Sequence, residues 1–140
     1  MAERLHHVHV FASDIEATIA WWRDMLGAVV AVDTELAGAR NVFLKIGGGR
    51  LHLYDQPPQD APKGDGRRGG AIHHIGIRSD DLPALVTRMR AKGAAFRSEI
   101  REFGWWRYIM VAAPDGVLLE LFAFDDEALE GGLADYFAER

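Results

Sequence analysis

The sequence contains no cysteine, so disulfides, zinc–thiolate sites and thiol catalysis are all excluded. Any metal that this chain binds must therefore use histidine, carboxylate or water ligands. The first residues, Met1 to His6, also lack a basic region followed by an apolar run, which is the pattern of a secretory signal. We therefore expect a cytoplasmic protein in a reducing compartment.

Long apolar runs and clusters of basic residues are missing as well. No stretch approaches the roughly 18 consecutive apolar residues that a membrane-spanning helix needs. The 16 lysines and arginines are scattered among 21 acidic residues, which leaves a net charge of −5. We therefore expect neither nucleic acid nor a membrane as a partner. With 49% hydrophobic residues, the 140-residue chain has enough apolar side chains for the core of one domain, residues 1–140.

Two stretches of the chain, residues 5–27 and 72–93, repeat one plan. Each contains a His-His pair, an alternating apolar strand, an acidic cap, an amphipathic helix and a final glycine. In the first copy, Ser13 and Glu16 predict a capping box, and Gly27 ends the helix. This repetition indicates an internal duplication.

The second helix is predicted to begin after Asp80 or Asp81, and strand-like runs follow each helix. The runs lie around residues 28–32, 41–46, 50–54, 95–100, 105–111 and 117–124. This order predicts an α+β fold of two tandem βαβββ modules, about residues 5–55 and 72–124.

The remaining residues predict a linker and a C-terminal segment. Residues 56–71 are polar and rich in proline and glycine, which is typical of a linker. They join two halves of one domain, because roughly 50 residues bury little core on their own. In the segment 125–140, Leu133, Tyr136 and Phe137 predict one apolar helical face. We expect this helix to dock on the body of the protein or on a second subunit.

Side chains alternate between the two faces of a strand, and this alternation places four candidate ligands on the faces turned away from the helices. The four are His7, His52, His74 and Glu120. Each module contributes one candidate from its first strand and one from its last. A twofold pairing of the modules into a curved sheet would bring all four to one central metal pocket. His6 and His73 have the opposite parity, so we expect them at the surface or the edge of the core.

A simpler explanation exists for each of these residues. A single histidine on a strand is more often hydrogen-bonded or exposed than bound to a metal. Glu120 carries a stronger signal, because it lies between two leucines and burying an unpaired carboxylate is costly. A metal, an arginine partner or an exposed edge position must account for it.

Several further residues are candidates for a substrate pocket. Trp105, Arg107 and Tyr108 lie together and would offer aromatic surface with one cation for an anionic substrate. His9 shares the strand face of His7 and is a fourth candidate. Packing in the core is the alternative explanation for the tryptophans.

Three motifs carry a specific resemblance. They are His7-Val-His-Val-Phe-Ala-Ser-Asp14, His74-Ile-Gly-Ile-Arg-Ser-Asp-Asp81 and Pro114-Asp-Gly-Val-Leu-Leu-Glu120-Leu. In these motifs the chain resembles the vicinal oxygen chelate superfamily, which includes glyoxalase I, methylmalonyl-CoA epimerase, extradiol dioxygenases and the bleomycin and fosfomycin resistance proteins. The resemblance covers about residues 5–124 and is greatest to the glyoxalase I and epimerase type.

The resemblance implies one divalent metal held by His7, His52, His74 and Glu120. Position 52 departs from the family pattern, because glyoxalase I and the epimerase carry Glu or Gln there. A set of three histidines and one carboxylate favours Zn, Ni, Co, Fe or Mn over Mg or Ca.

The resemblance also implies a reaction on a small-molecule substrate with adjacent oxygens. In the isomerase and lyase members, the metal polarises those oxygens and a carboxylate removes the neighbouring proton. Glu120 resembles the residue that serves as both ligand and base, and Glu35 lies near a second acid/base carboxylate of the epimerases. The leading hypothesis is therefore a metal-dependent lyase or isomerase, and a homodimer is expected because members commonly pair.

Two alternatives remain open. An extradiol dioxygenase would use His7, His74 and Glu120 as a facial triad, although Met110 stands where those enzymes carry a tyrosine. A metal-free antibiotic-binding resistance protein would use the same fold with an aromatic groove, although such sites lack the ligand set present here.

Overall fold

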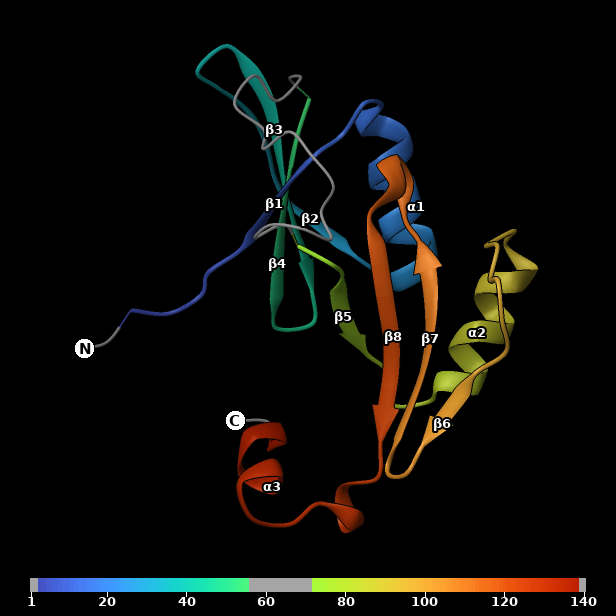
Figure 1. Ribbon diagram of the computed structural model, residues 1–140. Coiled ribbons are helices and arrows are strands. Elements are labelled where there is room, and N and C mark those ends of the chain that lie inside the picture. The colour runs from blue at the N-terminus through green and yellow to red at the C-terminus, as the bar shows by residue number, and fades with distance from the viewer. Residues whose placement is uncertain (1–2, 56–71, 139–140) are drawn as a thin grey trace. The chain divides into compact units, whose positions relative to one another are not determined.

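The computed structural model describes residues 3–55 and 72–138, and the chain divides into two compact units (Figure 1). Unit one contains Met1–Ala71 and Ala113–Val117, and unit two contains Ile72–Ala112 and Leu118–Arg140. The predicted linker, residues 56–71, lies outside the described residues. Among the helices of the described residues, none is long and apolar enough to cross a membrane.

Unit one follows the predicted order of one strand, one helix and three strands. The elements are β1 (Val8–Phe11), α1 (Ile15–Leu26), β2 (Val29–Leu36), β3 (Ala39–Ile46) and β4 (Gly49–Tyr54). The strands form one sheet in the order β1-β4-β3-β2, in which β1 runs parallel to β4 and the other neighbours are antiparallel. The short helical turn Pro114–Gly116 also belongs to this unit.

Unit two repeats the arrangement and adds a helix at its C-terminal end. Its elements are β5 (Ile75–Arg78), α2 (Leu82–Ala91), β6 (Arg101–Phe103), β7 (Trp106–Ala112), β8 (Leu118–Phe124), a helical turn at Asp126–Ala128 and α3 (Gly131–Phe137). The sheet order is β5-β8-β7-β6, again with a parallel first pair. The predicted α+β class and the two βαβββ modules are therefore confirmed.

One predicted strand is wrong in its position. The run at residues 95–100 contributes only an isolated bridge between Phe96 and Val111, and the strand forms at Arg101–Phe103 instead. The reason is local, because the side chain of Arg90 binds the Ser98 carbonyl at 3.2 Å and the Glu99 carboxylate at 3.2 Å. The Arg90 side chain thus occupies the Ser98 carbonyl, a backbone acceptor that a strand would use for pairing.

The start of α1 also differs from the prediction. Asp14, and not Ser13, is the N-cap, because its carboxylate accepts a hydrogen bond from the Ala17 N–H at 3.1 Å. Ser13 instead donates its backbone N–H and its hydroxyl to the Asp115 carboxylate. The predicted capping box is therefore wrong. Gly27 ends the helix as predicted, with a left-handed φ of 69°.

The second helix begins after Asp81, one of the two caps that the sequence predicts. Asp81 caps α2 through a hydrogen bond from the Ala84 N–H at 3.1 Å. An acidic residue therefore caps each of the helices that follow the first strands.

Each sheet has one buried face and one partly exposed face, as the strand alternation predicts. The buried faces carry Val42, Leu44, Leu51 and Leu53 in unit one and Ile109, Val111, Leu119 and Leu121 in unit two. The opposite faces carry Phe43, His52 and Tyr54 in unit one and Trp106, Tyr108, Glu120 and Phe122 in unit two. The polar candidates therefore lie on the faces that the cores leave partly open.

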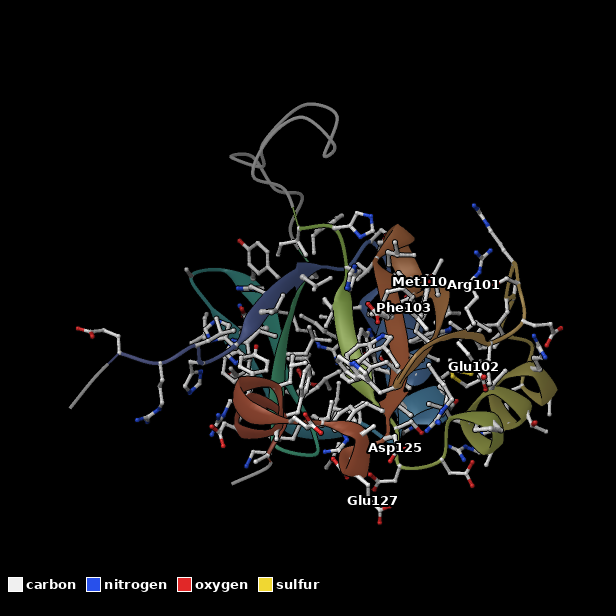
Figure 2. All side chains as sticks on the ribbon, turned by 60° about the horizontal axis from the view of Figure 1, so that its bottom comes forward. Arg101, Glu102, Phe103, Met110, Asp125 and Glu127 are labelled. Carbon is white, nitrogen blue, oxygen red and sulfur yellow. The ribbon has the colours of Figure 1, made fainter. Side chains whose placement is uncertain are left out.

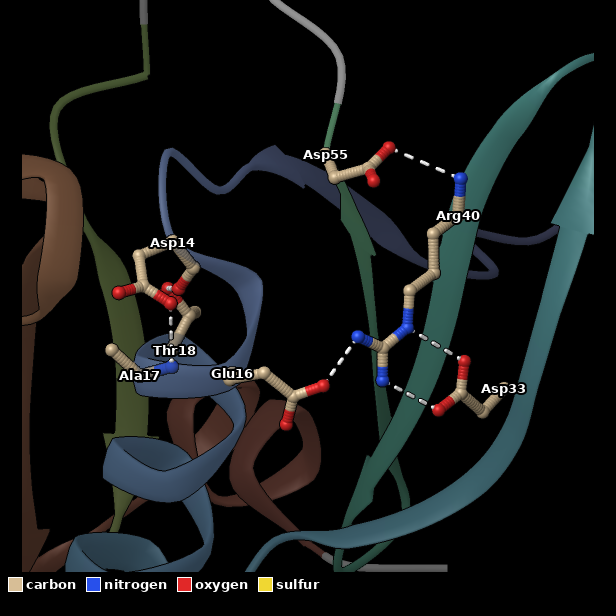
Figure 3. A network of polar contacts seen from close by, with 7 residues as sticks. All are labelled: Asp14, Glu16, Ala17, Thr18, Asp33, Arg40 and Asp55. Atoms are coloured by element: carbon tan, nitrogen blue, oxygen red, sulfur yellow. Dashed lines mark hydrogen bonds and ion pairs between the residues drawn. The ribbon is translucent and has the colours of Figure 1, made fainter.

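A polar network holds α1 to the sheet of unit one (Figure 3). Arg40 on β3 binds the Asp33 carboxylate of β2 through two nitrogens, at 3.0 and 2.7 Å, and also pairs with Glu16 of α1. Its backbone N–H donates to Asp55 at 3.0 Å. The guanidinium group lowers the pKa of Asp33, and the two carboxylates raise the pKa of Arg40. The network places the helix on the sheet face that carries Arg40 and Val42.

Candidate metal centre

The histidines of unit one gather around the parallel pair β1–β4. His7 directly precedes β1 and its ring stacks on His52 of β4, with centroids 3.7 Å apart and planes 12° apart. Phe43 of β3 stacks on His52 at 3.9 Å. The two nitrogens Nδ1 of His6 and His7 lie 3.0 Å apart. One ligand atom from each of His6, His7 and His52 lies within 4.8 Å of the others, and we call this the three-histidine cluster.

Strand register explains most of this gathering. His9 pairs with His52 across the parallel strands, so the residue that precedes β1 lies near the same ring. The sequence analysis predicted that His7 and His52 share a metal site but did not predict this parallel pairing, which brings their rings together. His6 was expected at the edge of the core or the surface, and it is exposed. The sequence analysis did not predict that the His6 ring joins His7 and His52, because strand parity assigned His6 to the opposite face.

The environments of His52 and His9 favour neutral imidazole. Burial lowers the pKa of His52, and the nearby His7, His9, His6 and Arg50 lower it further. Burial also lowers the pKa of His9, with an added effect from His7. Neutral imidazole is the form that binds a metal ion, so these shifts keep the rings competent for binding at a more acidic pH.

The same shifts predict how the metal-free protein responds to acid. His9 and His52 have lower pKa values in the folded chain than in the unfolded chain. The unfolded chain therefore takes up protons first, and stability present above about pH 6.5 is lost as the pH falls through the folded pKa values. We expect the melting temperature to fall between about pH 7 and pH 5. The fall should be smaller in His52→Gln, and an equal fall in both proteins would contradict the prediction.

In unit two, Glu120 and His74 form a direct pair. The Nε2 atom of His74, which directly precedes β5, lies 2.9 Å from Oε2 of Glu120 at the middle of β8. The indole Nε1 of Trp106 on β7 donates to Oε1 of Glu120 at 2.8 Å. The Glu120 side chain is only 16% exposed. These two contacts supply the partners that the sequence analysis required for a buried carboxylate. Neither partner is an arginine.

The predicted pocket residues of unit two divide between the two faces of β7. Tyr108 pairs with Phe122 and so shares the face of Glu120. Arg107 pairs with Ala123 and shares a strand face with the fully buried Ile109. It therefore lies on the face opposite to Glu120. Trp105 lies in the turn before β7, where its ring is 6.0 Å from Phe137 of α3.

Two residues on the Glu120 face were missed by the sequence analysis. Arg78 pairs with Phe122 in the β5–β8 register, its guanidinium group lies 4.2 Å from the centroid of the Phe124 ring, and it pairs with Asp126 at 3.5 Å. Trp106 is the other. Strand alternation could have found both, because Arg78 lies four residues after His74 and Trp106 lies two residues before Tyr108.

Glu35 lies apart from the histidines of its own unit. It pairs with Arg40 in the β2–β3 register, so it shares the sheet face of Arg40 and Val42. His52 pairs with Phe43 on the other face. A β-bulge between Val30 and Val32 sets this orientation. The structure therefore does not bring Glu35 beside His52.

Comparison with known proteins shows the family to which the chain belongs. The model of the Glyoxalase/Bleomycin resistance protein/Dioxygenase superfamily matches residues 4–121. The human mitochondrial methylmalonyl-CoA epimerase is 30% identical over 106 residues, which are 72% of this chain and 60% of that protein. The chain thus matches less than two thirds of the length of that relative. An ethylmalonyl-CoA/methylmalonyl-CoA epimerase of Cereibacter sphaeroides is 29% identical over 99 residues, 67% of this chain and 74% of that protein.

Solved structures show the same fold at lower identity. An antibiotic binding protein from Streptomyces sp. CB03234 has a TM-score of 0.73 and 22% identity, covering 89% of this chain and 98% of that chain. A Listeria monocytogenes fosfomycin resistance protein, solved as a complex with Mn(II), has a TM-score of 0.66 and 19% identity over 89% and 93% of the two chains. This chain belongs to the Glyoxalase/Bleomycin resistance protein/Dioxygenase superfamily.

Proposed function

We propose that this chain is a metal-dependent isomerase or lyase that removes a proton next to a carbonyl group of a small substrate. The observation that carries the proposal is the Glu120 carboxylate, held 2.9 Å from the His74 imidazole on the partly open face of its sheet. A held carboxylate is suited to act as a general base. The relatives named as epimerases support an isomerase within this class.

The residues present fit a divalent transition metal. In unit one, imidazole nitrogens of the three-histidine cluster lie within 4.8 Å of one another. In unit two, His74 and Glu120 place a nitrogen and an oxygen donor in contact. Such donors suit Zn, Ni, Co, Fe or Mn. When bound, the metal supplies Lewis-acid polarisation of substrate oxygens. That His7, His52, His74 and Glu120 together hold one ion stays a prediction from the sequence.

The side chains of unit two would perform the remaining steps. Glu120 would accept the proton from the carbon next to the carbonyl group, and epimerisation would be completed when water delivers a proton to the opposite face of that carbon. Arg78 and Tyr108 share the face of Glu120 and would bind polar or anionic groups of the substrate. The rings of Trp106 and Phe122 on the same face limit the access of water.

Solvent-deuterium exchange tests the proposal. The purified protein is analysed for metal content, loaded with Mn²⁺ or Co²⁺, and incubated in deuterated water with methylmalonyl-CoA or ethylmalonyl-CoA. Incorporation of deuterium next to the carbonyl group, lost after chelation, is expected. Lack of exchange into a panel of 2-oxo and acyl-CoA substrates, combined with oxygen uptake on catechols after ferrous loading, would replace the proposal with the dioxygenase alternative.

One observation favours a second candidate, a ligand-binding protein that performs no reaction. The partly exposed rings of Trp106 and Phe122 stack with planes 10° apart. A planar ligand would stack on such a surface. Tight binding of an aromatic antibiotic by the metal-free protein, with no exchange activity after metal loading, would favour this candidate.

The expected homodimer also stays a prediction. Edge strand β2 exposes four apolar side chains, those of Val29, Val30, Val32 and Leu36, and exposed apolar patches commonly mark contacts between proteins.

A further inference from the structure

Both oxygens of the Glu120 carboxylate have a partner within unit two. Oε2 faces Nε2 of His74 at 2.9 Å, and Oε1 accepts a hydrogen bond from Nε1 of Trp106 at 2.8 Å. An indole nitrogen can only donate, so the direction of the second bond follows from the chemistry. Each oxygen thus has a different task, since one partner is a candidate metal ligand and the other cannot bind a metal.

Aromatic packing holds the Trp106 ring in place. The ring stacks on Phe122 with centroids 4.4 Å apart and planes 10° apart, and Phe124 follows at 6.1 Å. Phe137 of α3 lies 5.5 Å from Trp106. An indole enclosed by three rings has little rotational freedom, so its N–H group keeps one direction.

Gly76 contributes to this packing. It pairs with Glu120 in the β5–β8 register, and a Cβ atom at this position would lie 3.3 Å from Cε1 of Phe122. A larger residue would push on the ring that supports Trp106. In unit one the matching position holds His9, which pairs with His52.

The two modules differ at the position of the donor. Glu120 pairs with Met110, and Trp106 lies four residues before Met110 on the same face. In unit one His52 pairs with Phe43, and the residue four positions earlier is Ala39. Alanine has no side-chain donor. The indole therefore occurs in the module that carries the carboxylate and is replaced in the module that carries a histidine.

We propose that Trp106 is a positioning residue for Glu120. Its N–H group holds Oε1 and turns Oε2 toward His74, so that a metal ion bound by the His74 imidazole would meet Oε2. Residues that bind the outer atoms of a metal ligand orient that ligand and raise metal affinity. The expected effect on metal affinity rests on the proposed function, whereas the positioning itself rests on the contact between Trp106 and Glu120.

Metal affinity in Trp106→Phe tests the consequence. The substitution keeps a ring for the Phe122 stack and removes only the N–H donor. We expect calorimetric titration with Co²⁺ alone to give about 10- to 100-fold weaker binding than the wild type. Trp105→Phe is the matched control. The Trp105 ring lies 5.5 Å from that of Trp106, but of these two tryptophans it is Trp106 that donates to Glu120. The control should bind Co²⁺ as the wild type does.

A double-mutant cycle separates positioning from general packing. If Trp106 acts through Glu120, Trp106→Phe has no further effect on Co²⁺ affinity in a Glu120→Ala background. An equal loss in both backgrounds would show a structural role and overturn the proposal, as would wild-type affinity in Trp106→Phe.

The contact can also be tested without metal. The indole N–H resonance of Trp106, assigned by its absence from the NMR spectrum of Trp106→Phe, should shift more than those of the other tryptophans in Glu120→Ala. If the wild type binds no Co²⁺, the proposed function fails, but a shift of this resonance still supports the positioning role of Trp106. The absence of a shift would overturn the positioning role.

Discussion

Glu120→Gln is expected to lower turnover by about 10²- to 10⁴-fold, the usual contribution of a general base. The amide keeps the size of the side chain and still has an oxygen that accepts from Trp106, but it cannot take a proton. Deuterium incorporation into methylmalonyl-CoA, or into another substrate that the wild type converts, measures the effect. Because the residue is partly buried and paired, melting curves must accompany the kinetics to confirm folding.

Glu102→Gln provides the matched control. Glu102 is an exposed residue of the edge strand β6, labelled in Figure 2, and it pairs across the sheet with Arg107 on the other face from Glu120. This variant removes the same charge from the same unit and should retain full turnover. Full turnover in Glu120→Gln would show that another group removes the proton.

Removing His7 or His74 is expected to abolish binding of a transition metal. Each imidazole is a predicted direct ligand, and loss of a direct ligand should weaken Co²⁺ binding by more than about 100-fold, since outer residues alone cost 10- to 100-fold. Elemental analysis of purified His7→Ala and His74→Ala, followed by calorimetric titration with Co²⁺, measures the effect. If all four predicted residues hold one ion, both variants lose the same binding event.

Neighbouring histidines supply the controls for this experiment. His73→Ala and His6→Ala change residues that directly precede the predicted ligands, and strand parity predicts that both variants keep the metal. Loss in His6→Ala together with full binding in His74→Ala would contradict the four-residue set. It would assign the ion to the three-histidine cluster, whose ligand atoms lie within 4.8 Å of one another.

Local pattern was enough to predict that His7, His52, His74 and Glu120 lie on strand faces turned away from the helices. It did not predict which of them would meet within a unit, and the fold pairs His7 with His52 and His74 with Glu120. Both pairs are in contact, with rings 3.7 Å apart in the first and atoms 2.9 Å apart in the second. Caps were less predictable, because the Ser13 hydroxyl donates to the distant Asp115 carboxylate, and Asp14 accepts from the Ala17 N–H instead.

Glu35 illustrates a limit of pattern reasoning. Val30 pairs with Leu44, but the bulge makes Val32 pair with Phe43, so every later residue of β2 is shifted by one. Without that extra residue, Glu35 would pair with Ala39 and share the face of His52. A one-residue shift moves a side chain to the opposite face of a sheet. The bulge depends on pairing with β3, which no local pattern of β2 predicts.

The sequence by itself determined the duplicated modules, the class of fold and the residue types able to hold a metal, because alternation and donor chemistry are local properties. Tertiary structure decided which of those residues meet. It placed Trp106 on Glu120, Arg78 on the same face, and Glu35 and Arg107 on opposite faces from the candidate ligands of their own units. These outcomes depend on strand register and on ring packing, which are contacts between distant residues that become defined only when the strands pair.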